Sequence, residues 1–421
     1  MQAPLPACRC GGPEPADGDR RPRRAAPNTA RSAARSHHDQ GPHSANEAAF
    51  EAIVIEDFNR DVAPNVKVNF TTYDWANMNT ELTTGFASGS PPDVLYLVDL
   101  IYPAYARQGV LHDMTELVSD PAWEGRARRD RAVRLGPGDP AGQHLGRAVL
   151  GAVYNIFLNL DLLDAAGVTG SWDGSYAAML EAAQKMTRDD VYGFSMRSRV
   201  ADFAFWDWFP YMHNAGADIF NADWSGCGLD NDDAKAAMQF LIDIHAAGVT
   251  PAVGSVDWQG MSDMFKAGRI AIHHGETPMI AELMANDPGF RWDVARAPGG
   301  PQGRTAMGNF GILCIAEASQ NKEAAWEFIK HWASGPMVGR FAEQVNLQVV
   351  RSDIVDGLFD GNPAMQKVQT EFVPTVKGVQ PHPKILQAMQ TMWPTAEDAY
   401  LGNLTGAEAI DEMCEAIEGV L

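Results

Sequence analysis

Residues 85–114 read GFASGSPPDVLYLVDLIYPAYARQGVLHDM, and this stretch indicates the fold class. Two prolines precede the apolar run Val94–Val98, and a short apolar run between helix-breaking residues is typical of a buried parallel strand. Asp99 follows the run directly, at the end of the strand where open α/β sheets bind their ligands. We expect a helix from Ile101 to Arg107, which Gly109 ends.

The alternation of strand and helix extends through most of the chain. Helical spacing precedes an alternating strand pattern at residues 66–70, and further strand patterns, separated by helical ones, occur at 153–159, 192–195, 269–273 and 310–315. This order is typical of an α/β protein. A length of 421 residues exceeds one ordinary core and predicts two domains, or three at most.

Composition excludes several classes of protein. The net charge of −21 repels nucleic acid and anionic membranes. No run of 18 apolar residues is present to span a membrane, and the first 30 residues contain no apolar core of a signal peptide. The five cysteines are scattered, so no disulfide framework or zinc spacing is expected, and Cys8 and Cys10 are interpreted as incidental thiols.

Two arginine-rich segments differ from the rest of the chain. Residues 1–45 contain 7 arginines and no lysine, and residues 124–149 contain 6 arginines and no lysine. Both contain few large apolar residues, which predicts a disordered tail and a disordered insertion. They are interpreted as aberrant, out-of-frame sequence. The alternatives are a basic arm and insertion that bind polyanions, or an ordinary disordered insertion.

Sequence motifs for catalysis or metal binding are missing. The chain has no G-x-S-x-G, P-loop or dinucleotide fingerprint. His273 and His274 are neighbours on a predicted strand, so their side chains point to opposite faces and are poorly placed to chelate one metal ion. The acidic run Asp230–Asp233 lacks the glycine and distal glutamate of a calcium loop and is expected to cap a helix. We therefore predict no metal and no cofactor.

Several phrases, taken in order, resemble one family. GFASGSPPDVLYL, YNIFLNLDLLDAAGV, FKAGRIAI, APGGPQG and SQNKEAAWEFIKHWAS resemble the extracellular solute-binding proteins of ABC importers, and specifically the sugar-binding, maltose-binding-protein-like group. The likeness covers residues 46–421 apart from the insertion. It implies a two-lobe periplasmic-binding-protein-like α/β fold of type II, with a hinge and an interlobe cleft. Lobe 1 would comprise 46–155 plus 294–345, and lobe 2 would comprise 156–293 plus 346–421.

The resemblance also implies a function. The chain would bind a sugar, oligosaccharide or polyol and deliver it to the membrane permease of an ABC transporter, as a monomer without catalytic activity. The location would be the periplasm or the cell surface, with a lipid anchor as one option. However, the family's first strand and export signal are missing where the arginine-rich tail lies, and the insertion replaces the entry to the hinge before Tyr154. The alternative is an extracellular carbohydrate-active enzyme, because paired carboxylates are easy to find in an acidic chain.

The candidate ligand-binding residues are aromatic platforms and planar polar groups. A sugar offers non-polar C–H faces and a fringe of hydroxyl groups, which suit such side chains. Each candidate has a structural alternative, such as core packing for a tryptophan or helix capping for an acid. The predicted residues are Trp75, Asp99, Trp206, Trp208, Trp258, Glu276, Asn309 and Trp393.

Overall fold

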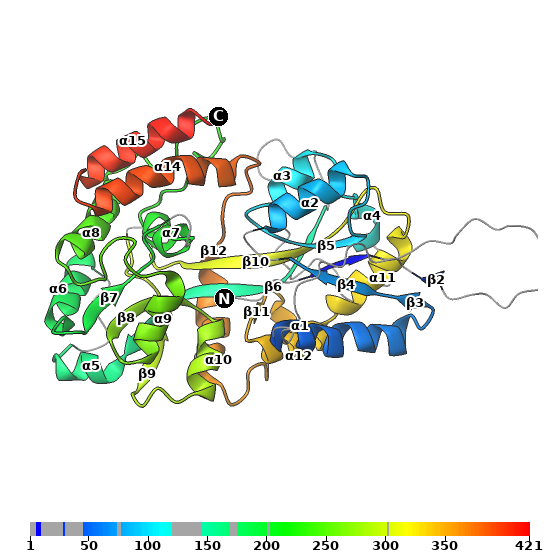
Figure 1. Cartoon of the computed structure of the whole chain (residues 1–421), viewed down its shortest axis with the longest axis horizontal. Helices are drawn as coiled ribbons and strands as arrows, with labels where there is room; N and C mark the ends of the chain where they lie inside the picture. Colours follow the sequence, from blue (N-terminus) through cyan, green and yellow to red (C-terminus); the bar gives the residue numbers. More distant parts are fainter. Residues whose placement is uncertain are drawn as a thin grey trace, which may run out of the picture. The chain divides into compact units, whose positions relative to one another are not determined.

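The chain is described by a computed structural model and divides into two compact units. The structure describes residues 6–9, 28–29, 45–73, 77–119, 145–168, 175–199, 203–300 and 303–421. Unit 1 comprises Met1–Gly151, Phe310–Val345 and Val349–Leu358, and unit 2 comprises Ala152–Asn309, Asn346–Gln348 and Phe359–Leu421. Both units mix helices and strands, in agreement with the predicted two-lobe α/β fold (Figure 1).

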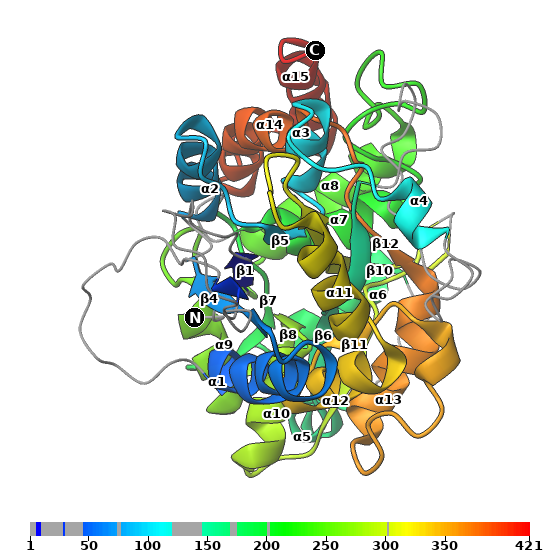
Figure 2. The same ribbon diagram turned by 90° about the vertical axis from the view of Figure 1, so that its right-hand side faces the viewer.

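Unit 1 places a small sheet against helices from both ends of its sequence. In Figure 2, helix α1 lies beside α12, and the aromatic rings of Phe50, Trp332 and Phe341 from α1, α11 and α12 form one buried cluster. Its elements are β1 (Pro6–Arg9), β2 (Asn28–Thr29), α1 (Ala45–Phe50), η1 (Glu51–Ile55), η2 (Phe58–Val62), β3 (Val66–Lys67), β4 (Asn69–Thr72), α2 (Met78–Ala87), β5 (Val94–Val98), α3 (Tyr102–Arg107), α4 (Thr115–Val118), α11 (Lys322–Trp332), α12 (Gly335–Val345) and η4 (Ser352–Ile354).

The apolar run that indicated the fold class forms β5, and every residue of this strand is buried. The prediction of a parallel strand is wrong for the pairings that the structure describes, because β5 pairs antiparallel with β1 and with β10 (Ala306–Ile315). Burial of both faces is what makes a strand uniformly apolar, whatever the direction of its neighbours. The predicted helix after Asp99 is α3, and Gly109 follows it with a φ of +68°, as expected for a helix-ending glycine.

Parts of the two arginine-rich segments form strands. Residues 6–9 form β1, which pairs with β4 and β5, and residues 28–29 form β2, which pairs with β3. The insertion ends inside β6 (Arg147–Asn159), whose residues are all buried. Disorder was therefore the wrong prediction for these residues, since backbone pairing needs no apolar side chains. The other residues of 1–44 and 120–144 lie outside the described part of the chain.

Unit 2 is built around the strands β6, β7 (Tyr192–Ser195) and β8 (Ile270–Glu276). Strand β8 runs parallel to β7 and antiparallel to β6, and β9 (Trp292–Ala295) pairs with β6. The helices and remaining strands of unit 2 are α5 (Leu160–Ala165), α6 (Tyr176–Met186), α7 (Phe205–Asn214), α8 (Asp232–Ala246), α9 (Trp258–Lys266), α10 (Pro278–Ala285), α13 (Pro363–Lys367), η5 (Val368–Phe372), η6 (Val373–Thr375), β12 (Val376–Lys377), α14 (Ile385–Tyr400) and α15 (Gly406–Glu418). β11 (Gln348–Val349) lies where the chain passes between the units.

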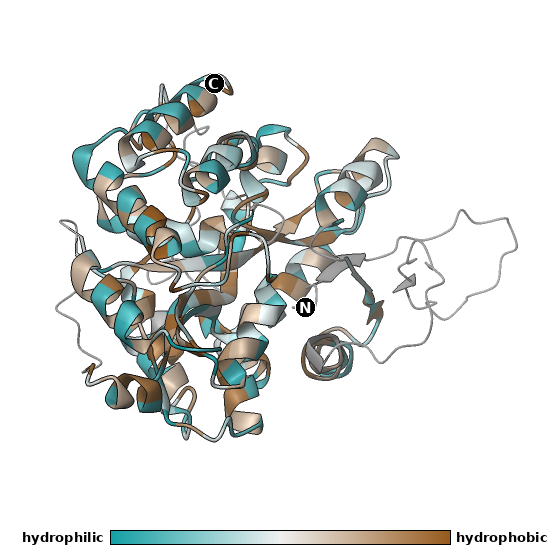
Figure 3. Ribbon diagram, turned by 60° about the vertical axis from the view of Figure 1, so that its left-hand side comes forward, coloured by the Kyte–Doolittle hydropathy of each residue, from teal (hydrophilic) through white to brown (hydrophobic). Residues whose placement is uncertain are grey.

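The helices bury one face against their own unit. Figure 3 shows them changing between hydrophilic and hydrophobic colour along their length, as expected of amphipathic helices. In unit 2, α8, α14 and α15 lie side by side (Figure 1). Helix α8 begins at the predicted cap, where the side chain of Asn231 accepts a hydrogen bond of 2.8 Å from the backbone N–H of Ala234.

Residues 152–155 belong to unit 2 instead of lobe 1, and the unit boundaries also differ from the expected lobe boundaries in two longer segments. Residues 294–309 belong to unit 2, because β9 pairs with β6 and Ala306 pairs with Val376. Residues 349–358 belong to unit 1, where the guanidinium of Arg351 donates a hydrogen bond to the backbone carbonyl of Ala333. Both differences arise from pairing partners that are distant in sequence, which periodicity does not reveal.

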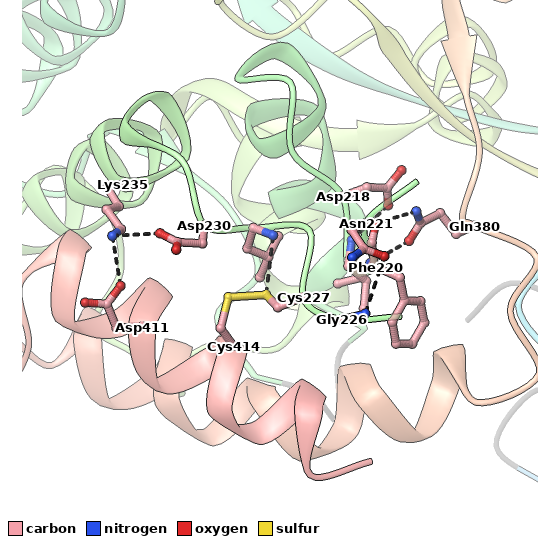
Figure 4. The surroundings of a disulfide bond; sticks show 12 residues. Asp218, Phe220, Asn221, Gly226, Cys227, Asp230, Lys235, Gln380, Asp411 and Cys414 are labelled. Atoms are coloured by element: carbon pink, nitrogen blue, oxygen red, sulfur yellow. Dashed lines mark hydrogen bonds and ion pairs between the residues drawn. A yellow bond between two sulfur atoms is a disulfide. The ribbon is translucent and has the colours of Figure 1, made fainter. Parts of the chain in front are cut away.

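A disulfide joins Cys227 to Cys414, which are 187 residues apart in sequence (Figure 4). The expectation of no disulfide was wrong, because spacing along the chain does not show which cysteines the fold brings together. The bond ties α15 to the loop that precedes α8, and Lys235 forms ion pairs with Asp230 and Asp411 beside it. The C-terminal helix is thus fixed by a covalent bond as well as by its buried apolar face.

Candidate functional site

Buried polar side chains gather in unit 2 at the carboxyl ends of two parallel strands. Arg197 lies two residues after β7, and Glu276 is the last residue of β8. Because β7 and β8 are parallel, both residues lie at the same edge of the sheet. Ligands of α/β sheets bind outside such an edge. This edge is therefore the candidate site.

Arg197 holds the cluster together. Its backbone N–H and its guanidinium donate hydrogen bonds to the carboxylate of Asp207, with distances of 2.7, 3.1 and 2.6 Å from N, Nε and Nη2. Its Nη1 lies 3.4 Å from Oε1 of Glu276. Asp207 lies in the first turn of α7, where the helix dipole also favours a negative charge. One buried cation is thus bound by two buried acids.

Arg197 and Asp207 keep each other ionised. Burial opposes ionisation of Asp207, but the charge and hydrogen bonds of Arg197 outweigh it and hold the pKa of Asp207 below its ordinary value. Burial also opposes the charge of Arg197, and the two carboxylates outweigh it and raise the pKa of Arg197. Both groups are charged at neutral pH, in surroundings where charges interact strongly.

An aromatic stack adjoins the cluster. The ring of Tyr154 lies 5.3 Å from that of Trp206 with an angle of 14° between their planes, and the guanidinium carbon of Arg197 lies 5.3 Å from the centre of the Tyr154 ring. Tyr154 faces Glu276 across the β6–β8 pairing. The prediction had assigned Trp206 and Glu276 to the site but missed Arg197, Asp207 and Tyr154. The position of Arg197 just after a strand was the signal that could have identified it.

The two neighbouring histidines contact different partners, as their positions on a strand predict. Nδ1 of His273 lies 2.8 Å from Oγ of Ser195, and Nε2 of His274 lies 2.8 Å from the hydroxyl of Tyr211. Burial lowers the pKa of His273 to about 3 and that of His274 to about 4, so both are neutral. Across the described residues, no group of three potential ligands could hold a metal ion.

Two predicted tryptophans lie in the core of unit 2. Trp208 and Trp393 are fully buried and pack edge-on, with ring centres 6.1 Å apart. The indole N–H of Trp393 donates a hydrogen bond of 3.1 Å to the backbone carbonyl of Ser198, next to Arg197. Trp393 therefore positions the loop that carries Arg197. Neither ring has a free face for a ligand in this conformation.

The other predicted residues have separate surroundings. Trp258 begins α9 half-buried, and its shielded indole N–H has no partner within the described residues. Asn309 is half-buried in β10 and is the last residue of the unit 2 segment Ala152–Asn309. Asp99 belongs to unit 1, and Trp75 lies outside the described residues. Of the predicted set, unit 2 thus brings Trp206, Glu276 and the supporting Trp393 to the carboxyl-end edge.

Asp99 carries an unusual carboxyl group. Its Oδ1 atom is shielded from solvent and has no hydrogen-bond partner within the described residues. Burial raises the pKa of Asp99 to about 8, although backbone N–H groups of Leu100 and Phe310 partly oppose the shift. At neutral pH this carboxyl group is therefore largely protonated.

A model of the family of bacterial extracellular solute-binding proteins matches residues 41–336. No curated protein sequence matches the chain. Within the part of the chain that the structure describes, no helix combines the length and the apolar composition required to span a membrane.

Solved structures share the fold over nearly the whole chain. An ABC transporter solute-binding protein from Thermotoga lettingae bound with α-D-tagatose is 20% identical, with a TM-score of 0.75 and coverage of 90% of this chain and 97% of that one. The GacH receptor of Streptomyces glaucescens, solved with acarbose, is 20% identical, with a TM-score of 0.77 and coverage of 90% and 96%. UgpB from Mycobacterium tuberculosis, solved with glycerophosphocholine, is 17% identical, with a TM-score of 0.76 and coverage of 90% and 96%.

Proposed function

Because the chain belongs to the family of bacterial extracellular solute-binding proteins, we propose that its solute is a small neutral carbohydrate and that it delivers this carbohydrate to the permease of an ABC importer. The observation that supports a carbohydrate is the Arg197–Asp207–Glu276 cluster beside aromatic rings at the carboxyl ends of β7 and β8. Fixed carboxylates and a guanidinium are suitable partners for sugar hydroxyls, and aromatic rings suit C–H faces.

The charge of the cluster favours an uncharged solute over one that carries a phosphate group. Arg197 is already bound by Asp207 and lies close to Glu276, so its positive charge is matched by buried acids. A phosphate group would have to compete with these carboxylates for the same guanidinium. Bound solutes of the structural neighbours include α-D-tagatose and acarbose, and also glycerophosphocholine. We propose that this chain prefers a neutral carbohydrate to a phosphodiester.

The disulfide supports export. Disulfides persist in oxidising compartments and are rare in the cytosol. The Cys227–Cys414 bond in unit 2 therefore fits a protein that works outside the cytoplasm. The periplasm or the cell surface is the proposed location, and a monomer is the proposed form. The closing of two lobes on the solute, which the family resemblance implied, stays a prediction.

Thermal unfolding with a panel of solutes tests the proposal. D-tagatose, maltose and acarbose represent neutral carbohydrates, and glycerophosphocholine represents a phosphodiester. A solute present at 100 times its Kd stabilises the folded state by about 2.7 kcal/mol, which raises the melting temperature measurably. Calorimetry then gives the Kd. A panel in which only glycerophosphocholine binds would overturn the preference for a neutral carbohydrate.

Glu276→Gln tests whether the cluster itself contacts the solute. The substitution keeps the shape of the side chain but removes its charge, and hydrogen bonds to charged groups contribute about 1.5–3 kcal/mol. We expect weaker binding and a smaller loss of stability than removal of Asp207 would cause, because Arg197 keeps its 2.6 Å ion pair with Asp207. Glu282→Gln is the matched control, because Glu282 is exposed on the following helix. Equal affinities of the two variants would remove Glu276 from the site.

Three further measurements address the remaining parts of the proposal. Incubation of a labelled maltooligosaccharide with the protein should yield no shorter products, whereas an enzyme would release them. The cognate permease, reconstituted in liposomes, should hydrolyse ATP faster when the solute-loaded protein is present. Sedimentation analysis should show one chain per particle.

A further inference from the structure

Trp206 was expected to provide the stacking surface for a sugar, but its ring is already enclosed in unit 2. The side chain is 4% exposed. Tyr154 covers it in a stacked arrangement, and Phe205 contacts it edge-on with ring centres 5.0 Å apart. In this conformation Trp206 supports other rings and offers no free face. A sugar ring received by unit 2 would therefore meet a side chain other than Trp206.

Phe203 is an exposed aromatic residue on the connection between β7 and α7. It is 38% exposed, whereas Phe205, two residues later in α7, is buried. The two rings meet edge-on with centres 5.7 Å apart, so the buried ring supports the exposed one. The connection leaves the carboxyl end of β7, the edge at which Arg197 and Glu276 lie.

The backbone of Phe203 adopts a conformation that phenylalanine rarely takes. Its φ is +55°, in the left-handed region where a bulky side chain is disfavoured. Such a conformation persists only where the surrounding structure determines it, and such residues cluster at functional sites. A glycine would take the same φ without strain. The presence of a large aromatic residue at this position therefore points to a use for its side chain.

The described ends of this connection are firmly held. The backbone carbonyl of Ser198 accepts a hydrogen bond from the indole of Trp393, and Oγ of Ser198 accepts one of 3.1 Å from the backbone N–H of Gly254. On the other side, the carbonyl of Phe203 accepts a hydrogen bond of 3.2 Å from the backbone N–H of Trp206. The last of these contacts holds the backbone of Phe203 to the first turn of α7.

We propose that Phe203 is the aromatic platform on which unit 2 receives the non-polar face of a sugar ring, while Glu276 of the cluster binds a hydroxyl group. This inference rests on the proposed function. A single exposed apolar residue is common and by itself carries no such meaning. Here exposure coincides with a strained backbone, a supporting ring and a position on the connection that follows the carboxyl end of β7.

The test compares Phe203→Gly, Phe203→Tyr and Phe203→Trp with the unmodified protein, using the tightest binder among maltose, D-tagatose and acarbose. Phe203→Gly removes the ring and relieves the strained φ, so we expect an equal or higher melting temperature together with affinity reduced about tenfold. Phe203→Tyr and Phe203→Trp keep a ring and should bind within about twofold of the unmodified protein. Leu401→Ala removes another exposed apolar side chain of unit 2 and is the control.

The outcomes separate this inference from the proposed function. If the unmodified protein binds none of the three sugars, the proposed function fails and the platform with it. If the unmodified protein binds a sugar and Phe203→Gly binds it equally well, only the platform is overturned. A rise in melting temperature combined with a loss of affinity, restored by Phe203→Tyr, supports the platform, because a purely structural residue would not produce both.

Discussion

Arg197 and Asp207 form an ion pair whose side chains are both shielded from solvent, with Nη2 and Oδ1 2.6 Å apart. Burial removes water from both charges, so each depends on the other. Asp207 also accepts hydrogen bonds from the backbone N–H and Nε of Arg197. The pair therefore joins the residue after β7 to the first turn of α7 and shapes the edge of the sheet.

Asp207→Asn should destabilise the protein strongly. Removal of one partner from a buried ion pair leaves an uncompensated charge and costs about 3–5 kcal/mol. Chemical denaturation measures this loss. Asp164→Asn is a matched control, because Asp164 also lies 2.6 Å from an arginine, Arg291, but both side chains are exposed. The control should cost less than about 1 kcal/mol, and equal losses for the two variants would contradict the argument.

Stability should fall in acid because neutral histidines are buried. Burial lowers the pKa of His245 from 6.5 to about 4, and those of His273 and His274 are lowered as well. Between pH 4 and 6.5 the unfolded chain therefore binds more protons than the folded one, so the free energy of unfolding decreases as pH falls. Each histidine contributes a slope of up to about 1.4 kcal/mol per pH unit.

His245→Phe isolates the contribution of His245 to the pH dependence of the free energy of unfolding. The ring of His245 stacks on that of Tyr400 with centres 4.6 Å apart, an arrangement that phenylalanine can reproduce. The variant should lose stability less steeply than the unmodified protein between pH 6.5 and 4. Denaturation curves at several pH values measure the two slopes. Parallel slopes would show that His245 does not bind its proton on unfolding.

Local pattern predicted the fold class and part of the candidate site. Uniform apolarity identified β5, and the neighbouring positions of His273 and His274 on a strand predicted their separate contacts. The sequence could not show that Trp208 and Trp393 meet in the core. A tryptophan that packs in a core and one that lines a binding site cannot be told apart by residue type alone. Nor could the sequence pair Arg197 with Asp207 or Cys227 with Cys414, since those contacts depend on the tertiary fold.

The Asp99→Asn variant should become more stable relative to the unmodified protein as pH rises. Burial raises the pKa of Asp99 from 3.8 to about 8, so between these values the folded state holds a proton that the unfolded state releases. The free energy of unfolding of the unmodified protein therefore decreases as pH increases across this window. Asparagine does not titrate. The variant should gain stability relative to the unmodified protein by up to about 1.4 kcal/mol per pH unit from pH 4 to 8.

Denaturation of both proteins at pH 5 and pH 8 measures this difference. A constant difference between the two pH values would mean that Asp99 titrates normally in the folded protein. As pH rises, the titration of Asp99 lowers the free energy of unfolding, whereas the titration of the buried histidines raises it and takes place below pH 6.5. The interval from pH 6.5 to 8 therefore separates the effect of Asp99 from theirs.

The Cys227–Cys414 disulfide should contribute a large part of the stability of unit 2. A cross-link lowers the entropy of the unfolded chain, and removal of a native disulfide typically costs about 2–5 kcal/mol. The 187-residue separation places this bond toward the upper end of that range. The double variant Cys227→Ser, Cys414→Ser should still fold, because α15 retains its buried apolar face and Lys235 keeps its ion pairs with Asp230 and Asp411 (Figure 4).

Thermal unfolding with and without dithiothreitol checks this prediction. The reductant should lower the melting temperature of the unmodified protein to that of the double serine variant and should leave the variant itself unchanged. Cys314→Ala is the control, because Cys314 is a buried free thiol and its variant should keep the full response to reductant. An unmodified protein whose melting temperature is insensitive to complete reduction, verified by thiol counting, would show that the cross-link does not stabilise the fold.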